Sequence, residues 1–238
     1  MGFQSDHGQR LRNVRAVYAD DPLLSSLTSD ETATTPDFDS KRVFDIVFSA
    51  LAIVFFAPIL LGVAALLKLR EGGTVFFAHE RVGRGGRRFR CLKFRTMVPD
   101  AEERLAEILA SDPVARAEWD ATRKLTHDPR ISCLGNFLRR TSLDELPQFF
   151  NVLKGEMSVV GPRPIVVEEM VLYRESIVEY LAVRPGVTGL WQVSGGSDTT
   201  FDERVALDSR YVRAMRLLED VRIVARTVGV LLNQKGAR

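Results

Sequence analysis

The sequence predicts a helix-rich α/β fold (α+β), in which an apolar membrane segment precedes a compact domain with a small sheet. Three features support this prediction. Residues 43–67 contain a single charged side chain, residues 88–94 alternate as a strand does after a glycine turn, and much of the remaining chain has the apolar spacing of helices. With 238 residues the chain can bury one core of ordinary size together with appendages.

Charge is distributed unevenly along the chain. Residues 1–40 contain three Arg and seven Asp or Glu, whereas the remainder contains 30 Lys or Arg and 24 Asp or Glu. The first 40 residues are also rich in Ser, Thr and Pro, so we expect a disordered acidic tail without a secretory signal. Cys91 and Cys133 form no CxxC or Cys/His cluster, which argues against a disulfide framework or a zinc site and favours a reducing compartment.

Residues 41–70 are the candidate membrane anchor. Between residues 43 and 67 only Asp45 is charged. A straight helix of this length would measure about 37 Å, which exceeds a bilayer core of roughly 30 Å. The segment is apolar on every face, whereas the core helix of a soluble protein usually has one apolar stripe.

Two features argue against a simple transmembrane helix. Pro58 lies in the middle of the segment, where it removes one helical hydrogen bond and costs roughly 3 kcal/mol. Both ends are basic, with Lys41 and Arg42 before the segment and Lys68 and Arg70 after it, so a spanning helix would place one pair on the disfavoured side. A re-entrant membrane helix hairpin, broken at Pro58, accounts for both features. A kinked transmembrane helix is the alternative.

The next region is predicted to form a basic strand pair. Two strand-like stretches flank a glycine turn at residues 82–86, and seven Lys or Arg lie between residues 81 and 95. Such a basic face is typical of contact with anionic lipid. The alternative is that Lys93 and Arg95, whose spacing places them on one side of a strand, contact a phosphate. RNA binding is disfavoured because the stretch lacks interleaved aromatics and an RNP-like motif, so no nucleic-acid partner is expected.

Residues 139–164 concentrate charged side chains around two adjacent carboxylates, Asp144 and Glu145. Ser142 and Glu145 match a capping box, which predicts a helix beginning one residue after the serine and gives the acids a structural purpose. Pro147 argues against a regular helix here, and a single cap does not need both acids. A carboxylate among arginines and near a cation stays ionised at neutral pH, so the alternative is a nucleophile toward phosphorus or a magnesium ligand.

The same stretch ends in a rigid Gly-Pro-Arg-Pro turn. Pro162 and Pro164 hold Arg163 in a fixed, non-helical backbone. A guanidinium presented in this way offers a planar fork that suits a phosphate. Residues 168–182 and 201–230 follow with helical patterns.

Several motifs in this order resemble one family. They are KRVFD from residue 41, ERVGRGGRRFRCLKFRTM from residue 80, FLRRTSLDELPQFFNVLKGEMSVVGPRP from residue 137, RPGVTGLWQVSG from residue 184, and LDSRYV from residue 207. Over roughly 190 of its 238 residues the chain resembles the bacterial sugar transferases that are monotopic phosphoglycosyl transferases (polyprenyl-phosphate hexose-1-phosphate transferases). The number, length and order of the motifs make this resemblance specific.

The resemblance implies a particular architecture. Residues 41–70 would form the re-entrant membrane helix, and residues 71–238 a cytoplasmic phosphoglycosyl transferase domain at the bacterial inner (cytoplasmic) membrane. The membrane turn of the family often contains Ser-Pro, whereas this chain has Ala57-Pro58. The hydroxyl that would satisfy a freed carbonyl in that turn is therefore missing.

The resemblance also implies a reaction. A hexose 1-phosphate would move from a UDP-sugar to undecaprenyl (polyprenyl) phosphate with release of UMP, as the first membrane step of exopolysaccharide or other lipid-linked glycan assembly. Asp144 would attack the β-phosphorus and form an aspartyl-phosphosugar, which the lipid phosphate would then attack. Two covalent steps avoid assembling two anionic substrates at once, and Mg²⁺ would offset charge on the phosphoryl group. The alternative is a catalytically idle membrane-bound scaffold or partner-binding homologue.

The motif positions assign candidate site residues. Asp144 and Glu145 are the candidate catalytic pair, and Asp144 is also the candidate metal ligand. The candidate substrate contacts are Lys93, Arg95, Arg139, Gln148, Arg163, Asp208 and Asp220, of which the last two match acidic positions that alternatively serve as structural supports. Gly196 stands where the family commonly has Arg, and its effect is not assigned. The sequence does not fix the sugar, the glycan pathway or the oligomeric state, although a homodimer and contact with anionic lipids are compatible with it.

Overall fold

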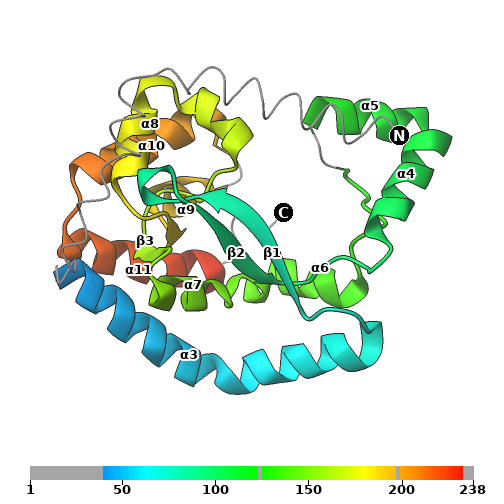
Figure 1. Ribbon diagram of the computed structural model, residues 1–238, viewed down its shortest axis with the longest axis horizontal. Helices are drawn as coiled ribbons and strands as arrows, with labels where there is room; N and C mark the ends of the chain where they lie inside the picture. The colour runs from blue at the N-terminus through cyan, green and yellow to red at the C-terminus, as the bar shows by residue number, and fades with distance from the viewer. Residues whose placement is uncertain (1–39, 123–124, 197–198, 233–238) are drawn as a thin grey trace.

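The computed structural model describes residues 40–122, 125–196 and 199–232. Apart from Ser40, the predicted acidic tail lies outside the described residues, as does the end of the predicted domain beyond residue 232. The described chain is rich in helices and contains two small sheets (Figure 1). This agrees with the predicted helix-rich α/β class.

The N-terminal helix is the longest element of the described chain. Helix α3 (Ser40–Leu66) continues into the π-helical turn η1 (Leu67–Glu71). Among the described residues, this is the one helix that is long and apolar enough to cross a membrane. Many of its apolar side chains are exposed, among them Leu51 at 66% and Phe55 at 76%, which argues against a buried helix of a soluble core.

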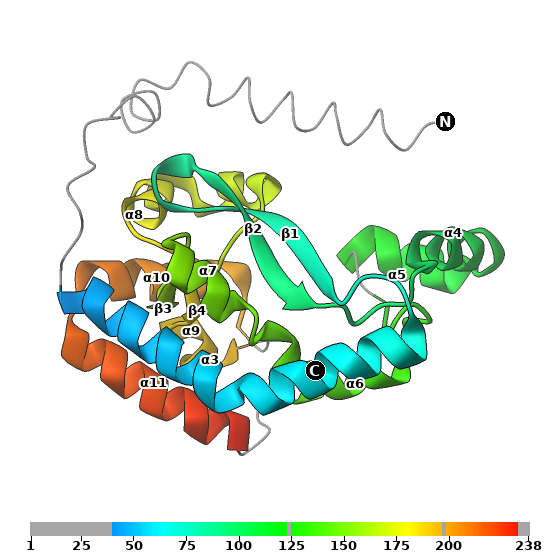
Figure 2. The ribbon, with the colours of Figure 1, turned by 60° about the horizontal axis from the view of Figure 1, so that its bottom comes forward.

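Helix α3 is bent rather than broken. The sequence predicted a hairpin that is interrupted at Pro58, but the helix runs continuously through this residue. Its ribbon bends near the middle in both views (Figures 1 and 2). Proline has no N–H to donate to the carbonyl four residues earlier, so a bend that opens one side of the helix costs little additional hydrogen bonding.

Both ends of α3 pack against the same folded domain. Near the N-terminal end, Phe44 and Phe48 contact the main buried cluster around Val152 and Met157. Near the C-terminal end, Val63 and η1 contact a second cluster around Phe94. The exposed middle of the helix therefore lies between two anchored ends.

The two sheets have two strands each. Strand β1 (Phe76–Val82) pairs antiparallel with β2 (Arg88–Phe94) across the turn η2 (Arg84–Gly86), which confirms the predicted strand pair, with a longer first strand than expected. Strand β3 (Ser158–Val160) pairs in parallel with β4 (Gly186–Thr188).

The remaining helices surround these strands. Helices α4 (Ala101–Ser111) and α5 (Pro113–Thr122) extend away from the body, with the predicted break at Asp112 between them (Figure 1). The others are α6 (Cys133–Arg140), η3 (Leu143–Glu145), α7 (Gln148–Lys154), η4 (Val167–Ser176), α8 (Ile177–Ala182), α9 (Leu190–Ser194), α10 (Phe201–Arg213) and α11 (Leu217–Leu232). In Figure 2, α6 and α11 lie on the same side of the domain as α3.

Candidate active site

The two adjacent carboxylates lie in a tight turn between α6 and α7. Ser142 has a φ of 55°, the left-handed conformation, and a 3₁₀ turn follows it. The serine side chain makes no capping hydrogen bond, so the predicted capping box does not form. Pro147 precedes α7, which begins at Gln148. The irregular turn expected from Pro147 is thus confirmed, and Asp144 lies in a 3₁₀ turn rather than in a regular α-helix.

Asp144 is nearly buried, at 8% exposure. Burial, and after it the neighbouring Glu145 carboxylate, raises the pKa of its carboxyl group to about 6, although Lys93 and Arg139 act in the opposite direction. Within the described part of the chain, no side chain forms a hydrogen bond or ion pair with this carboxylate. At neutral pH most of it is ionised, so it is a charged group available to an incoming ligand.

Glu145 is held by a cation from the antiparallel strand pair. The Lys93 ammonium on β2 donates to Glu145 Oε1 at 2.5 Å, and both side chains are partly exposed. Asn151 on α7 fixes β2 beside this turn: it accepts from the backbone N–H of Leu92 at 3.0 Å and donates to the carbonyl of Arg90 at 2.8 Å. The buried Asn151 therefore sets the register between the carboxylate turn and the strand that carries Lys93.

Arg139 approaches the carboxylates from the last turn of α6. Its Nε donates to Thr96 Oγ1 at 2.8 Å. Helix α6 packs against the backbone of Thr96, because Gly135 has no Cβ and a Cβ there would lie 1.9 Å from the Thr96 carbonyl oxygen. This contact directs the end of α6, and with it Arg139, to the edge of the site.

Arg95 has different partners from Lys93. Its Nη2 donates to the carbonyl of Gly72 at 2.7 Å, and it lies 3.6 Å from the Glu71 carboxylate at the end of η1. The structure therefore does not bring Arg95 to Asp144, although the sequence grouped it with Lys93. Arg95 therefore joins the end of η1 to the rest of the domain.

Arg163 lies in a second group of charged and aromatic side chains. Its Nη1 is 3.8 Å from Glu169, and its guanidinium lies 5.9 Å from the centre of the Trp191 ring. Arg204 stacks on the same ring at 4.5 Å. The buried Gln148, at 3% exposure, is the first residue of α7 and follows the carboxylate turn directly.

The two acids near the C-terminus support the fold. Asp208, at 2% exposure, accepts a hydrogen bond from Tyr173 at 2.8 Å. Burial raises the pKa of Asp208 to about 7 even though this hydrogen bond favours the ionised form. Asp220 is fully buried and accepts from Lys41 at 2.7 Å and from Tyr211 at 2.6 Å. This arrangement fits the structural alternative for both acids.

Sequence reasoning missed several residues that position the site. Asn151 stood in an apolar stretch, and a buried amide in such a stretch is the signal that it binds backbone groups. Lys41 was assigned to the membrane boundary, whereas it bridges Asp220, Tyr211 and the carbonyl of Val160. Its true partners are more than 100 residues away, so spacing alone could not identify them.

The donor groups of the turn fit a magnesium ion. Mg²⁺ is usually held by one or two carboxylates and completes its shell with water and substrate phosphates. Asp144 has no side-chain partner, and Glu145 is adjacent. Within the described ranges no three His, Cys, Asp or Glu side chains cluster as an all-protein metal site. The carboxylate pair is therefore suited to a metal shared with a phosphate ligand rather than to a closed structural site.

Comparison with known proteins identifies the family. A family model for bacterial sugar transferases matches residues 37–234, a range that contains every candidate site residue. The chain belongs to the bacterial sugar transferase family. This membership places it among sugar transferase enzymes, as the motif resemblance indicated.

Relatives within this sugar transferase family cover the same region. The chain is 50% identical over 197 residues to the undecaprenyl-phosphate galactose phosphotransferase of Salmonella typhimurium, covering 83% of this chain and 41% of the relative. It is 49% identical over 197 residues to the UDP-galactose-lipid carrier transferase of Erwinia amylovora, with coverages of 83% and 41%. It is 47% identical over 198 residues to the exopolysaccharide production protein ExoY of Rhizobium meliloti, with coverages of 83% and 88%. The chain thus spans about two fifths of the first two relatives and most of the third.

Proposed function

We propose that this chain transfers a hexose 1-phosphate from a UDP-sugar to undecaprenyl phosphate and releases UMP. The observation that carries the proposal is Asp144, a nearly buried carboxylate without a side-chain partner among the described residues; the nearby charges of Lys93 and Arg139 oppose the rise in its pKa. The names of the Salmonella and Erwinia relatives indicate the class of donor and acceptor. The name of the Rhizobium relative indicates exopolysaccharide assembly as the pathway.

In the first step, an oxygen of the Asp144 carboxylate attacks the β-phosphorus of the UDP-sugar. The bond between this phosphorus and the bridging oxygen breaks, and UMP leaves with that oxygen and the bond electrons. An aspartyl-phosphosugar remains on the protein. Lys93 and Arg139 lie where they can offset negative charge on the phosphoryl oxygens, and their attraction also lowers the pKa of the attacking carboxylate.

In the second step, a phosphate oxygen of undecaprenyl phosphate attacks the phosphorus of the aspartyl-phosphosugar. The acyl phosphate bond breaks, Asp144 regains its carboxylate, and an undecaprenyl diphosphate sugar leaves. Leu143, next to Asp144, packs in the cluster that holds the C-terminal half of α3. This neighbourhood supports the proposal that the lipid phosphate reaches the carboxylate from the side of α3.

Asp144 and Glu145 would hold a magnesium ion together with the donor diphosphate. The ion would supply positive charge that stabilises the transferring phosphoryl group. Lys93 would then orient Glu145, to which it already donates a hydrogen bond. Arg163 and the group around Trp191 are proposed to contact the nucleotide or phosphate portion of the donor, and Gln148 to contact substrate from the start of α7.

The anchoring of α3 supports a re-entrant arrangement at the inner membrane. A transmembrane helix would place its two ends on opposite faces of the bilayer. Here Lys41 at one end and Leu67 at the other both contact the same domain, so both ends lie on its side. We propose that the domain lies on the cytoplasmic face, where nucleotide sugars are made. A homodimer stays a prediction.

The test is UMP release in detergent from a panel of UDP-sugars, with and without undecaprenyl phosphate and magnesium. Asp144→Asn is compared with Asp120→Asn, which makes the same change at an exposed position of α5. We expect Asp144→Asn to reduce UMP release at least roughly a thousandfold, as loss of a covalent nucleophile does. Asp120→Asn should match the wild type.

The covalent intermediate has its own readout. With UDP-sugar alone, the wild type should release about one UMP per molecule and retain the labelled β-phosphate on the protein. Direct transfer without an intermediate predicts no UMP until the lipid phosphate is added. Absence of UMP with every UDP-sugar, from folded protein, would favour another donor nucleotide or the non-catalytic scaffold.

A further inference from the structure

One face of β1 continues the candidate active site along the strand pair. In the antiparallel register Phe77 lies opposite Lys93, and His79 lies opposite Cys91. Side chains two positions apart on a strand point to the same face, so His79 and Arg81 lie on the face of Phe77. The rings of Phe77 and His79 are 6.0 Å apart, which is consistent with this placement. These three side chains, Phe77, His79 and Arg81, are called the β1 row below.

The β1 row is accessible because β1 is the outer strand of the pair. Asn151 of α7 binds the backbone of β2, so β1 lies on the side of β2 away from α7 (Figure 2). On the face of the row, Phe89 and Cys91 of β2 pack in the main buried cluster. Phe77, by contrast, is 53% exposed. Its ring therefore has apolar surface that a ligand bound beside Lys93 would remove from water.

The β1 row connects the two charged groups of the site. At its first end, Lys93 donates to Glu145 of the carboxylate turn. At its last end, Arg81 lies 3.9 Å from the Glu169 carboxylate, which also lies 3.8 Å from Arg163. The first and last residues of the row are four positions apart, so the row is about 14 Å long at about 3.4 Å per residue. This length is comparable with that of an extended nucleoside diphosphate.

The chemistry of the β1 row changes from apolar at Phe77 to cationic at Arg81. Between them, His79 Nδ1 lies 3.1 Å from Arg81 Nη2 and must accept this hydrogen bond, because a guanidinium can only donate. The proton of the neutral imidazole is then on Nε2, where it can be donated to a ligand. Partial burial, and after it the Arg81 charge, lowers the pKa of His79, so the neutral imidazole is expected at pH 7.

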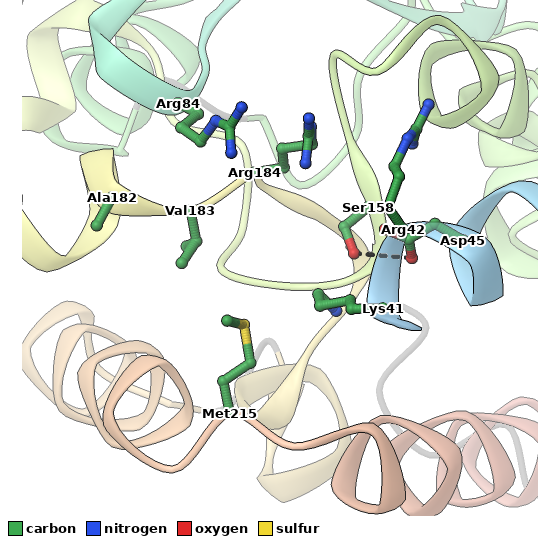
Figure 3. A pocket seen from close by; sticks show the side chains of 9 residues that line it. All are labelled: Lys41, Arg42, Asp45, Arg84, Ser158, Ala182, Val183, Arg184 and Met215. Atoms are coloured by element: carbon green, nitrogen blue, oxygen red, sulfur yellow. Dashed lines mark hydrogen bonds between the residues drawn. The ribbon is translucent and has the colours of Figure 1, made fainter. Parts of the chain in front are cut away.

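Two cavities elsewhere in the described chain do not suit a nucleotide sugar. One lies at the N-terminal end of α3, where Lys41, Asp45 and Ser158 are among its lining residues (Figure 3). Its volume of about 70 Å³ corresponds to roughly two water molecules, each of which takes about 30 Å³ in the liquid. The other lies along α4, and its lining includes the carboxylates of Asp100 and Glu107, which would repel a diphosphate. Neither lining includes a residue of the carboxylate turn.

We propose that Phe77 is the platform on which the hexose of the donor stacks. The nucleotide portion extends in the other direction, over His79 toward Arg81. This inference rests on the proposed function, which places the transferred β-phosphorus beside Lys93. The groups on either side of that phosphorus are the hexose and the α-phosphate. A hexose has a face of C–H groups that suits an aromatic ring, whereas an anionic phosphate suits the Nε2–H of His79 and the guanidinium of Arg81.

The test compares Phe77→Ala with Phe76→Ala, the same change one residue earlier. Phe76 is 49% exposed, close to the 53% of Phe77, but it lies on the opposite face of the strand and stacks on Phe94. Both changes are made in the full chain with Asp144→Asn, the parent of this experiment, in which the proposed first step is blocked. UDP-galactose, UDP-glucose, UDP-N-acetylglucosamine and UMP are titrated into each protein in detergent with magnesium, and binding is measured by calorimetry.

We expect Phe77→Ala to weaken binding of the preferred UDP-hexose roughly tenfold, because the ring contact is lost. Its affinity for UMP, which has no hexose, should match that of the parent, and Phe77→Tyr should restore binding of the UDP-hexose. His79→Ala should weaken UMP and the UDP-hexose alike, because it contacts the part that they share. In the chain with Asp144 intact, Phe77→Ala should raise KM for the UDP-hexose and leave kcat close to wild type.

Three results would overturn the proposal: no UDP-hexose binds the parent, Phe77→Ala binds the UDP-hexose as tightly as Phe76→Ala, or Phe77→Ala weakens UMP and the UDP-hexose equally. Loss of binding to phosphatidylglycerol vesicles, with UDP-hexose affinity unchanged, would place the ring in the bilayer instead. A wild type that binds a UDP-hexose but releases no UMP counts against the transfer reaction and leaves the Phe77 comparison measurable. If Phe77→Ala does not fold, Phe77→Leu, which keeps apolar bulk without a planar ring, provides the measurement.

Discussion

Two buried aspartates, Asp144 and Asp220, are used in opposite ways. Asp220 is fully buried, and its two oxygens accept from Lys41 and Tyr211. Asp144 is exposed by only 8% and has no side-chain partner among the described residues. The Asp220 carboxylate joins α3 to α11, whereas burial and the neighbouring Glu145 raise the pKa of Asp144 to about 6. Both carboxylates are buried, so burial alone does not separate the supporting acid from the proposed nucleophile; the two differ in their side-chain partners.

The largest effect on stability is expected at the supporting acid. Asp220→Asn leaves the Lys41 ammonium without its carboxylate, and breaking one partner of a buried pair costs about 3 to 5 kcal/mol. Thermal unfolding in detergent measures this loss. UMP release per folded molecule should stay close to wild type.

A double-mutant cycle checks the origin of that loss. Lys41→Met introduced beside Asp220→Asn should restore part of the stability, with a coupling free energy above about 1 kcal/mol. Simple addition of the two single effects would show that the ion pair does not account for the loss.

A gain in stability, rather than a loss, is expected when the proposed nucleophile Asp144 is replaced. The folded pKa of Asp144, about 6, lies above its ordinary value of 3.8, so its ionised form weakens the fold as pH rises through this window. Asp144→Asn removes the charge and should stabilise the protein near neutral pH by up to about 3 kcal/mol, at about 1.4 kcal/mol for each pKa unit. When unfolding is measured with EDTA present, the stability gained by Asp144→Asn should be smaller at about pH 5 than near neutral pH. A loss of stability in the variant would contradict the comparison.

A smaller effect is expected on the pH profile of activity. As the proposed nucleophile, the Asp144 carboxylate would have to be ionised to attack phosphorus, so UMP release should rise with pH through about 6. Lys93 lowers this pKa, so Lys93→Gln should move the acidic limb of the profile to higher pH. If Lys93→Gln lowers UMP release at every pH without shifting the acidic limb of the profile, Lys93 does not affect the ionisation of Asp144.

The smallest effect on stability and UMP release is expected from substitutions of Ser142, which lies two residues before Asp144. Ser142 adopts a left-handed conformation that costs an L-residue about 1 to 2 kcal/mol. Ser142→Gly should be tolerated, with stability and UMP release near wild type, whereas Ser142→Val should lose about 1 to 2 kcal/mol and reduce UMP release. Chemical or thermal unfolding and the UMP assay would be read together. Equal behaviour of the two variants would show that this conformation does not position Asp144.

The sequence predicted features that depend on neighbouring residues. The strand pair, the break at Asp112 and the irregular turn at Pro147 follow from glycine and proline, whose backbone preferences act locally. The capping box at Ser142 does not form: the serine is left-handed and makes no capping hydrogen bond, whereas a capping residue usually has an extended backbone. The motif resemblance identified the family, which the family model confirms.

Features that depend on distant contacts were not predictable in this way. Lys93 and Arg95 share a spacing that suits one strand face, but Arg95 follows the end of β2 and binds Glu71 instead. Ser158 and Val159, which donate hydrogen bonds to Asp45, lie more than 110 residues away from it in the sequence. Such pairings depend on how the helices and strands pack, and a single sequence carries no direct record of that packing.

The way α3 is held has a consequence for the membrane itself. Both ends of the helix contact one domain, so in the proposed re-entrant arrangement its exposed middle would add cross-sectional area to the near leaflet and little to the far one. A bilayer with unequal leaflet areas curves, and the expanded leaflet forms the convex side. Dense clusters of this protein would therefore bend the membrane toward the side that carries the domain, and the shape of the surrounding bilayer would in turn favour or oppose its insertion.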